Sequence, residues 1–383
     1  PSKGQLVKMI FGRREILFVL GLLSGASAFT TPRAMGVTLT KGASQISRVV
    51  PPAMSKETEE ELDSDENKAE HQSYSLDMSK TIYTSSLKSP KDSYIAFAEK
   101  GAANAKMAKR KIFHQSVMGG CYVGFGGLLS LCVAGNIAGI GATNPGLVKM
   151  AFAALFPVNL LLIITTGGQL FTGNSATVAA ARYEGLVDTY ELLRNWSVSL
   201  IGNVVGCGIM ACAAWYVGCL TGGTADLLAK TAVGKCSATV MQSFVKAIMC
   251  NWMVSLAVFL SGASNDLAGK LVGVWFPIST FVAIGLEHSV ANMFLMPAAL
   301  LLKLPLTFGD VLFKNIIPVL AGNAVAGAIV VAASYSYQFG RLGGKRRSIF
   351  AEKLADYERK KKEIKEKMEI RKNSPAVSTV ELL

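Results

Sequence analysis

The sequence FVAIGLEHSVANMF, residues 281–294, lies at the centre of a run from Leu271 to Leu302 whose only ionisable residues are Glu287 and His288. A straight helix crosses the hydrocarbon core of a bilayer with about 20 residues. The 32 residues of this run would form a helix about 47 Å long, too long for one straight span. An ionisable pair is also costly in lipid. The run therefore predicts a membrane helix that is broken near Glu287 and His288.

A second long run has the same character. Residues 151–181 carry no charge, and the sequence TTGGQLFTGN, residues 165–174, lies in their middle. Glycine and polar residues at that depth predict a second broken helix. Broken helices at corresponding positions of two halves are typical of transporters and channels with inverted repeats and a site near the membrane midplane. Backbone groups freed at such breaks must line a cavity or be buried in protein.

The remaining pattern supports two related halves. Phe156-Pro157 recurs as Phe276-Pro277, and Gly202-Asn203 recurs as Gly322-Asn323, both 120 residues later. The sequence predicts an all-α membrane protein with six transmembrane helices, arranged as an aquaporin-like inverted repeat (3+3) with broken second and fifth helices. The predicted spans are residues 115–148, 151–181, 195–225, 247–265, 271–302 and 315–340.

Composition and charge agree with a membrane core. Of the 383 residues, 51% are hydrophobic and 17% are charged, against roughly 25% charged in soluble proteins. Residues 113–340 hold nine Lys or Arg and seven Asp or Glu, and the basic excess lies in the flanks. This layout argues against a soluble enzyme, a disordered chain and a nucleic-acid binder. Basic clusters at residues 106–111 and 341–347 place both ends of the six-span region on the cytosolic or stromal side.

The cysteines do not indicate a metal site or a disulfide framework. There are seven of them, mostly in apolar runs, and no C-x-x-C pair is present. We interpret them as small buried hydrophobic residues. No cofactor and no metal are expected, and no nucleophile–base set suggests an enzyme.

The ends of the chain predict targeting and solvated segments. Basic residues, an apolar run from Ile16 to Leu23 and Ala26-Ser27-Ala28 form a secretory signal. Residues 29–56 are rich in Ser and Thr and carry two Arg and two Lys but no acid. Residues 1–56 therefore resemble a signal plus transit-type presequence of algae with secondary plastids; an ordinary signal peptide with a linker is the alternative. Residues 57–87 form an acidic, disordered spacer, 88–340 the six-span channel domain, and 341–383 a basic amphipathic C-terminal helix or tail.

Several core residues are candidates for the transport path. His288 is expected to face a pore, since its ordinary pKa of about 6.5 suits proton exchange near neutrality. Glu287 and Asn292 are interpreted as structural residues at the helix break. Lys235, just before the fourth span, is either an anion-attracting charge or a flanking residue whose amine reaches the interface.

The other candidates have two readings each. The apolar ones either constrict the path or pack the core; they are Phe156, Leu160, Leu170, Phe171 and Phe281. Asn203, Asn251 and Asn323 either bond between helices or line the pore. Gly119, Gly120, Gly124, Gly126 and Gly127 indicate close helix contact or an oligomer face.

These motifs resemble the formate–nitrite transporter family. FVAIGLEHSVANMF, residues 281–294, is similar to its fifth-span motif, Leu170-Phe171-Thr172-Gly173 is similar to its second-span omega loop, and Pro90, Tyr94, Gly101 and Lys106 fit its entry segment. The resemblance covers roughly residues 88–340. It implies a homopentamer of aquaporin-like protomers, each with its own pore for small monovalent anions such as formate or nitrite.

The resemblance also implies residue roles. His288 matches the central pore histidine, Thr172 the omega-loop threonine, and Lys235, Asn251 and Asn323 polar residues around the path. Phe156, Leu160, Leu170 and Phe281 match the constrictions. The targeting extension and the basic tail depart from the family pattern, and Thr165 and Thr166 are peculiar to this chain.

Two mechanisms stay open at this point. A bare anion in an apolar constriction is very costly, so either fixed donors replace its water or it takes a proton near His288 and crosses as a neutral acid. We expect a mixture of the two, in which Lys235 concentrates anions and His288 hydrogen-bonds and protonates them. We expect nitrite import into plastids, with integral, multi-pass placement in the plastid envelope and no nucleic-acid partner. The alternatives are a formate/lactate–proton exporter at the plasma membrane and an aquaporin-like neutral-solute channel.

Overall fold

A computed structural model describes residues 87–344 of the chain. The predicted presequence (1–56), nearly all of the acidic spacer (57–87) and the C-terminal segment beyond residue 344 lie outside the described residues. Within the described part the structure is helical, and its extended pairing is a single isolated bridge between Leu87 and Ser264.

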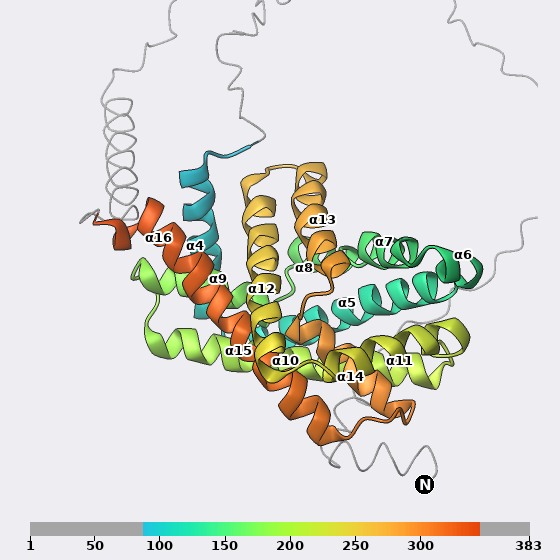
Figure 1. The fold of residues 1–383 in the computed structure, drawn as a ribbon. Coiled ribbons are helices and arrows are strands. Elements are labelled where there is room, and N and C mark those ends of the chain that lie inside the picture. Colours follow the sequence, from blue (N-terminus) through green and yellow to red (C-terminus); the bar gives the residue numbers. More distant parts are fainter. Residues whose placement is uncertain (1–86, 345–383) are drawn as a thin grey trace, which may run out of the picture. The chain divides into compact units, whose positions relative to one another are not determined.

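Figure 1 shows the order of the helices along the chain, which we describe in two series. The first comprises α4 (Pro90–Lys106), α5 (Lys109–Gly135), α6 (Ala138–Thr143), α7 (Pro145–Leu155), α8 (Val158–Thr166), α9 (Phe171–Tyr183) and α10 (Thr189–Tyr216). The second comprises α11 (Gly222–Cys236), α12 (Val240–Ala263), α13 (Leu267–Ile284), α14 (Ser289–Leu301), η3 (Asp310–Ile316), α15 (Ile317–Val325), η4 (Ala326–Ala333), α16 (Ser334–Phe339) and η5 (Arg341–Gly343). Segments η3 and η4 are π-helical.

Six helical segments of the described region are long and apolar enough to cross a membrane, as the sequence predicts. They are Lys109–Gly135, Pro145–Thr166, Thr189–Tyr216, Val240–Ala263, Leu267–Ile284 and Asp310–Phe339. Several begin before the predicted spans because charged residues such as Lys109, Arg194 and Lys246 belong to the helices themselves.

Both predicted breaks are present. Helix α8 ends at Gly167 and α13 ends at Gly285, and both glycines have positive φ, 82° and 83°. Left-handed backbone there closes the helix with C-terminal capping bonds and favours glycine. The chain then continues for a few residues and starts a new half-helix, α9 at Phe171 and α14 at Ser289.

Glycine permits close contact between helices α5 and α10. A Cβ on Gly120 would lie 2.5 Å from the carbonyl oxygen of Asn203, and one on Gly206 would lie 2.0 Å from that of Val117. These distances leave no room for a methyl group. The reading of the α5 glycines as residues of close helix contact is therefore confirmed.

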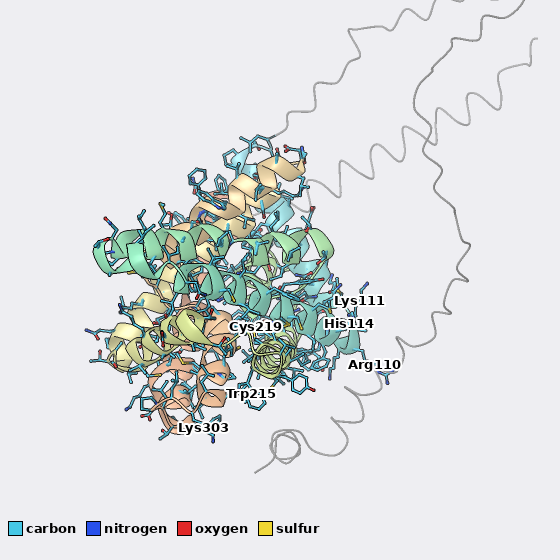
Figure 2. The ribbon with its side chains drawn as sticks, turned by 90° about the vertical axis from the view of Figure 1, so that its right-hand side faces the viewer. Arg110, Lys111, His114, Trp215, Cys219 and Lys303 are labelled. Carbon is cyan, nitrogen blue, oxygen red and sulfur yellow. The ribbon has the colours of Figure 1, made fainter. Side chains whose placement is uncertain are left out.

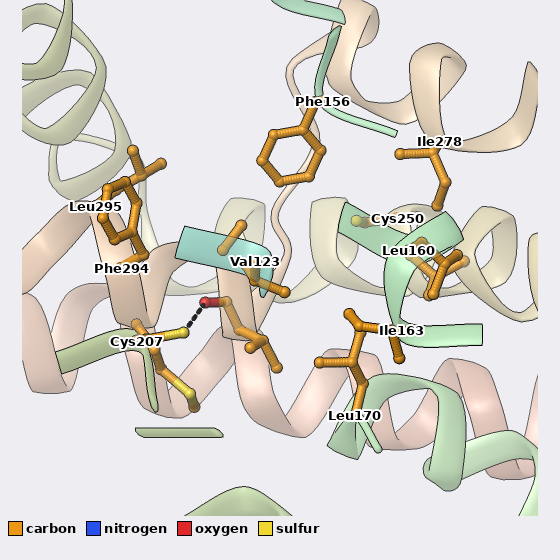
Figure 3. Packing of buried hydrophobic residues seen from close by; sticks show 14 of the residues in the cluster. Val123, Phe156, Leu160, Ile163, Leu170, Cys207, Cys250, Ile278, Phe294 and Leu295 are labelled. Carbon is orange, nitrogen blue, oxygen red and sulfur yellow. Dashed lines mark hydrogen bonds between the residues drawn. The ribbon is translucent and has the colours of Figure 1, made fainter. Parts of the chain in front are cut away.

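The main apolar core lies around the two breaks (Figure 3). It includes Phe156, Leu160, Leu170 and Phe294, all buried. Cys207 lies in the same cluster, and its thiol donates a hydrogen bond to the Val290 carbonyl oxygen with an Sγ–O distance of 3.4 Å. Cys207, Cys236 and Cys250 are buried as expected, whereas Cys121, Cys132 and Cys212 are half-buried and Cys219 is exposed (Figure 2).

Candidate functional site

The two half-helix starts are held by the same kind of bond. The Oδ1 of Asn203 accepts from the backbone N–H of Phe171 at 2.8 Å, and the Oδ1 of Asn323 accepts from that of Ser289 at 2.9 Å. Each amide group also donates back to the loop before its half-helix, Asn203 to the Gln169 carbonyl and Asn323 to the Glu287 carbonyl. Protein groups thus satisfy backbone freed by the breaks, as a membrane interior requires.

His288 occupies the N-cap of α14. Its Nδ1 accepts from the backbone N–H of Ala291 at 2.9 Å, and its Nε2 lies 3.1 Å from Oγ1 of Thr172 across the bundle. A backbone N–H can only donate, so Nδ1 carries no proton in this arrangement. The neutral ring therefore has its proton on Nε2 and donates to the Thr172 hydroxyl. Thr172 and His288, one from each half, are brought together as the residue patterns imply.

Two phenylalanines surround the imidazole. The Phe281 ring stacks on His288 with a centroid distance of 5.7 Å and an interplanar angle of 17°. Phe156 packs edge-on against Phe281 at 6.3 Å. Both side chains are buried and both line a cavity that reaches His288. These rings make the surroundings of the polar pair apolar.

Glu287 is the centre of a buried polar cluster. Its Oε2 accepts from Nζ of Lys235 at 3.0 Å, from Nδ2 of Asn292 at 2.7 Å and from Nδ2 of Asn315 at 3.2 Å. The Glu287 side chain is only 2% exposed and that of Lys235 is 17% exposed. The carboxylate is held by side chains of α11, α14 and η3, which fixes the loop that carries His288.

An uncharged cluster repeats this pattern at the other break. The Oε1 of Gln169 accepts from Asn174 at 2.9 Å and from Asn195 at 3.1 Å, and Asn104 on α4 donates to Asn174 at 3.0 Å. The shared offsets could have revealed Gln169, Asn174, Asn195 and Asn315, which were not candidates from the sequence. Gln169 and Asn174 precede Glu287 and Asn292 by 118 residues, and Asn195 precedes Asn315 by 120.

A cavity of about 330 Å³ opens toward His288. Its walls come from α6, α7, α11, α13 and α14 and from the loop 285–288. Lys235 lines it, together with Phe156, Phe281 and Asn292. Lys149 and Lys230 line it as well, and neither was a candidate from sequence.

Asn203, Asn251 and Asn323 form hydrogen bonds between helices. Nδ2 of Asn251 donates to Oγ of Ser175 at 2.9 Å and to the Asn323 carbonyl at 2.6 Å, and it lies 3.3 Å from the Thr172 carbonyl. These bonds correspond to the interhelical reading of Asn203, Asn251 and Asn323. Among the described residues, the buried Oδ1 of Asn251 and Oγ of Ser289 have no hydrogen-bond partner.

The remaining apolar candidates lie in the core beside the cavity. Leu160 and Leu170 are buried in the main cluster (Figure 3). Phe171 packs edge-on against Trp196 at a centroid distance of 5.9 Å. None of the three lines the cavity described above, so their role as constrictions stays a prediction. His114 lies near Arg110 and Lys111 at the exposed start of α5, away from the site (Figure 2).

Six helical segments of the described residues are long enough to cross a membrane, and the second and the fifth are each followed by a break and a half-helix beside the buried His288. This arrangement defines a multi-pass membrane transport protein. More narrowly, the chain belongs to the formate/nitrite transporter family, whose sequence profile matches residues 91–337. The family consists of transporters and channels rather than enzymes.

Individual relatives agree with this assignment. A probable formate transporter of Methanothermobacter thermautotrophicus is 40% identical over 272 residues, which cover 67% of this chain and 98% of the relative. A formate-nitrite transporter of Toxoplasma gondii is 36% identical over 257 residues, covering 65% of this chain and 51% of the relative. A solved pentameric formate channel with formate bound matches with a TM-score of 0.53 and 25% identity, covering 61% of this chain and 98% of that channel. An ion channel of the same family matches in fold with a TM-score of 0.59.

Proposed function

We propose that this protein conducts small monovalent anions, nitrite and formate among them, through a pore in each protomer with His288 at its centre. The relatives named above support anion transport. The observation that carries the role of His288 is the contact between its Nε2 and Oγ1 of Thr172 at the buried junction of the two half-helices.

The geometry favours fixed donors over a proton relay. The Ala291 N–H occupies Nδ1, so an imidazolium would place two N–H groups against each other there. The neutral ring donates from Nε2 to Thr172, and the Thr172 hydroxyl hydrogen has no acceptor among the described residues. An anion can accept that hydrogen as the last member of a polarised chain of donors. Such donors replace part of the water that an anion loses between Phe156 and Phe281.

Flux in proteoliposomes tests this role. We expect His288→Phe to lower nitrite and formate flux by at least about tenfold, because a hydrogen bond to a charged group contributes about 1.5–3 kcal/mol. His288→Asn keeps an N-cap and a donor and should retain more flux than His288→Phe. His114→Phe is the matched control, because His114 is exposed and should leave flux unchanged. Normal flux in His288→Phe would disprove the role.

The substrate and location are proposed from the presequence. Residues 1–56 carry a signal plus transit-type composition, which supports nitrite import across the plastid envelope. A fusion of residues 1–60 to a fluorescent protein should label plastids; plasma-membrane label would favour the formate/lactate–proton exporter. Liposome swelling in nitrite, formate, chloride and glycerol separates an anion path from a neutral-solute channel, and varied pH reveals any coupling to protons.

We also propose a homopentamer. The pentameric formate channel is a structural relative. Large hydrophobic side chains are exposed on the spans, for example Phe125, Ile201 and Trp252, and such faces suit lipid or neighbouring protomers. Light scattering of the detergent-solubilised protein should give five chains per particle.

A further inference from the structure

The charge of Lys235 is already matched. Its Nζ lies 3.0 Å from Oε2 of Glu287 and 3.4 Å from the Leu286 carbonyl oxygen. Glu287 is almost fully buried and is held by two further donors, Asn292 and Asn315. The ion pair thus adds a dipole to the cavity wall but no net charge. Lys235 is therefore poorly suited to attract anions from a distance.

Two other lysines line the same cavity with unmatched charge. Lys149 extends from α7 and Lys230 from α11, and both are exposed. Neither forms an ion pair with any residue of the range 87–344. The described residues that line the cavity include no Asp or Glu. Asp226 lies one turn before Lys230 on α11 but does not line it.

The walls between these lysines and His288 are largely apolar. They include Phe152, Phe156, Leu227, Phe281 and Leu295. Low-dielectric walls concentrate the field of nearby charges and raise the local concentration of counter-ions. A positive potential from Lys149 and Lys230 would therefore extend along the cavity toward the imidazole.

We propose that Lys149 and Lys230, rather than Lys235, draw anions into the cavity that leads to His288. This inference rests on the proposed anion transport and identifies the residues that set its rate at low anion concentration. Attraction by exposed charges is screened by salt, with a Debye length of about 30 Å at 0.01 M and about 8 Å at 0.15 M ionic strength. A purely structural role would not depend on salt in this way.

The test is equilibrium exchange of radiolabelled formate across proteoliposomes, which does not depend on protein orientation. We expect the double variant Lys149→Gln/Lys230→Gln to slow exchange by about three- to tenfold at 0.01 M ionic strength and by less than about twofold at 0.3 M. The maximum rate at saturating formate should change by less than about twofold. Lys149→Arg/Lys230→Arg should exchange like the wild type.

Lys303→Gln is the matched control. Lys303 is an exposed lysine in the loop after α14 and does not line the cavity (Figure 2), so its loss should leave exchange and salt dependence unchanged. If the wild type exchanges formate and the double variant exchanges it equally fast at low salt, the role of Lys149 and Lys230 is disproved while the proposed transport function stands. A wild type that exchanges no more than empty liposomes would instead overturn the proposed transport function.

Discussion

At the residue scale, the contact between His288 and Thr172 is the most specific feature. His288 was selected from the sequence because it interrupts a long apolar run, and Thr172 was selected through the resemblance to the formate–nitrite transporter family. The sequence left open which imidazole nitrogen faces the path. That is decided by the N-cap geometry, in which the Ala291 N–H bonds to Nδ1. Such a detail depends on backbone dihedral angles that no local pattern specifies.

The Thr172 hydroxyl gives the first prediction at this scale. Thr172→Val removes the acceptor of the His288 Nε2–H and the last donor toward the anion, leaving a buried donor unpaired at a cost of about 1–3 kcal/mol. We expect formate flux in proteoliposomes to fall by about tenfold or more. Thr172→Ser should keep flux within about threefold of wild type.

Thr165→Val is the control for that variant. The Thr165 hydroxyl is exposed and bonds back to the Leu161 carbonyl of its own helix, so its removal should leave flux unchanged. Equal flux in Thr172→Val and wild type would show that the hydroxyl does not act on the anion.

Close packing gives a second residue-scale prediction. Gly206→Ala would place a methyl group 2.0 Å from the Val117 carbonyl oxygen and force α5 and α10 apart. The expected loss of stability is about 1–3 kcal/mol, seen as a lower melting temperature in detergent. Gly208→Ala on the same helix meets no atom within 4 Å and should be neutral or slightly stabilising. An equal effect of both variants would contradict the packing explanation.

At the scale of elements, a buried cluster of polar side chains holds the loop at each of the two breaks. One cluster contains an ion pair and the other contains only uncharged amides. The loop before α14 is held by the Lys235–Glu287 pair, and the loop before α9 by amides around Gln169. A single polar residue in an apolar run is usually interpreted as forming a hydrogen bond between helices. For that reason Gln169, Asn195 and Asn315 were not selected as candidates from the sequence. Only their common spacing connects them.

This correspondence predicts a compensated double variant. Glu287→Gln leaves the Lys235 ammonium without its carboxylate and should cost about 1.5–3 kcal/mol of stability. Lys235→Asn/Glu287→Gln makes this cluster uncharged, like the amide cluster around Gln169 at the other break. We expect it to recover most of that loss in thermal unfolding. A double variant no more stable than Glu287→Gln would mean that the two clusters are not interchangeable.

At the scale of the whole described region, its first and last helices meet at one buried carboxylate. Glu184, after α9, accepts from the Tyr94 hydroxyl at 2.8 Å, from the Ser336 hydroxyl at 2.7 Å and from the Arg341 backbone N–H at 3.2 Å. Tyr94 and Phe339 also pack with ring centroids 6.2 Å apart. One side chain thereby joins α4, α9 and α16.

This junction predicts sensitivity to alkali. Burial raises the pKa of Tyr94 well above its ordinary value of 10.0, so the unfolded chain loses this proton first as pH rises. The stability that the neutral phenol contributes is complete below pH 10 and falls above it. The melting temperature of the wild type should therefore decline more steeply above pH 10 than that of Tyr94→Phe. Tyr190→Phe, which alters an exposed tyrosine, should keep the wild-type slope.

The general architecture was accessible from sequence, because overlong uncharged runs interrupted by glycine can form few structures in a membrane. Helix α11 was not predicted, since Asp226, Lys230 and Lys235 interrupt the apolar pattern within it. Lys149 was passed over because it separates two uncharged stretches and reads as a boundary. Residues that come together only in the tertiary fold, such as those of the cavity wall, cannot be recognised from a local sequence pattern.

Helix α9 has a consequence beyond packing. It carries Thr172 in its first turn and is followed directly by Glu184. The 12 residue steps from Thr172 to Glu184 correspond to about 18 Å along the helix axis. Ser336 and Arg341 bond to Glu184 at one end of this rod, and Thr172 lies at the other end. We therefore expect a spectroscopic label near Ser336 to report displacements of helix α9, and with it of Thr172, from a position outside the cavity that reaches His288.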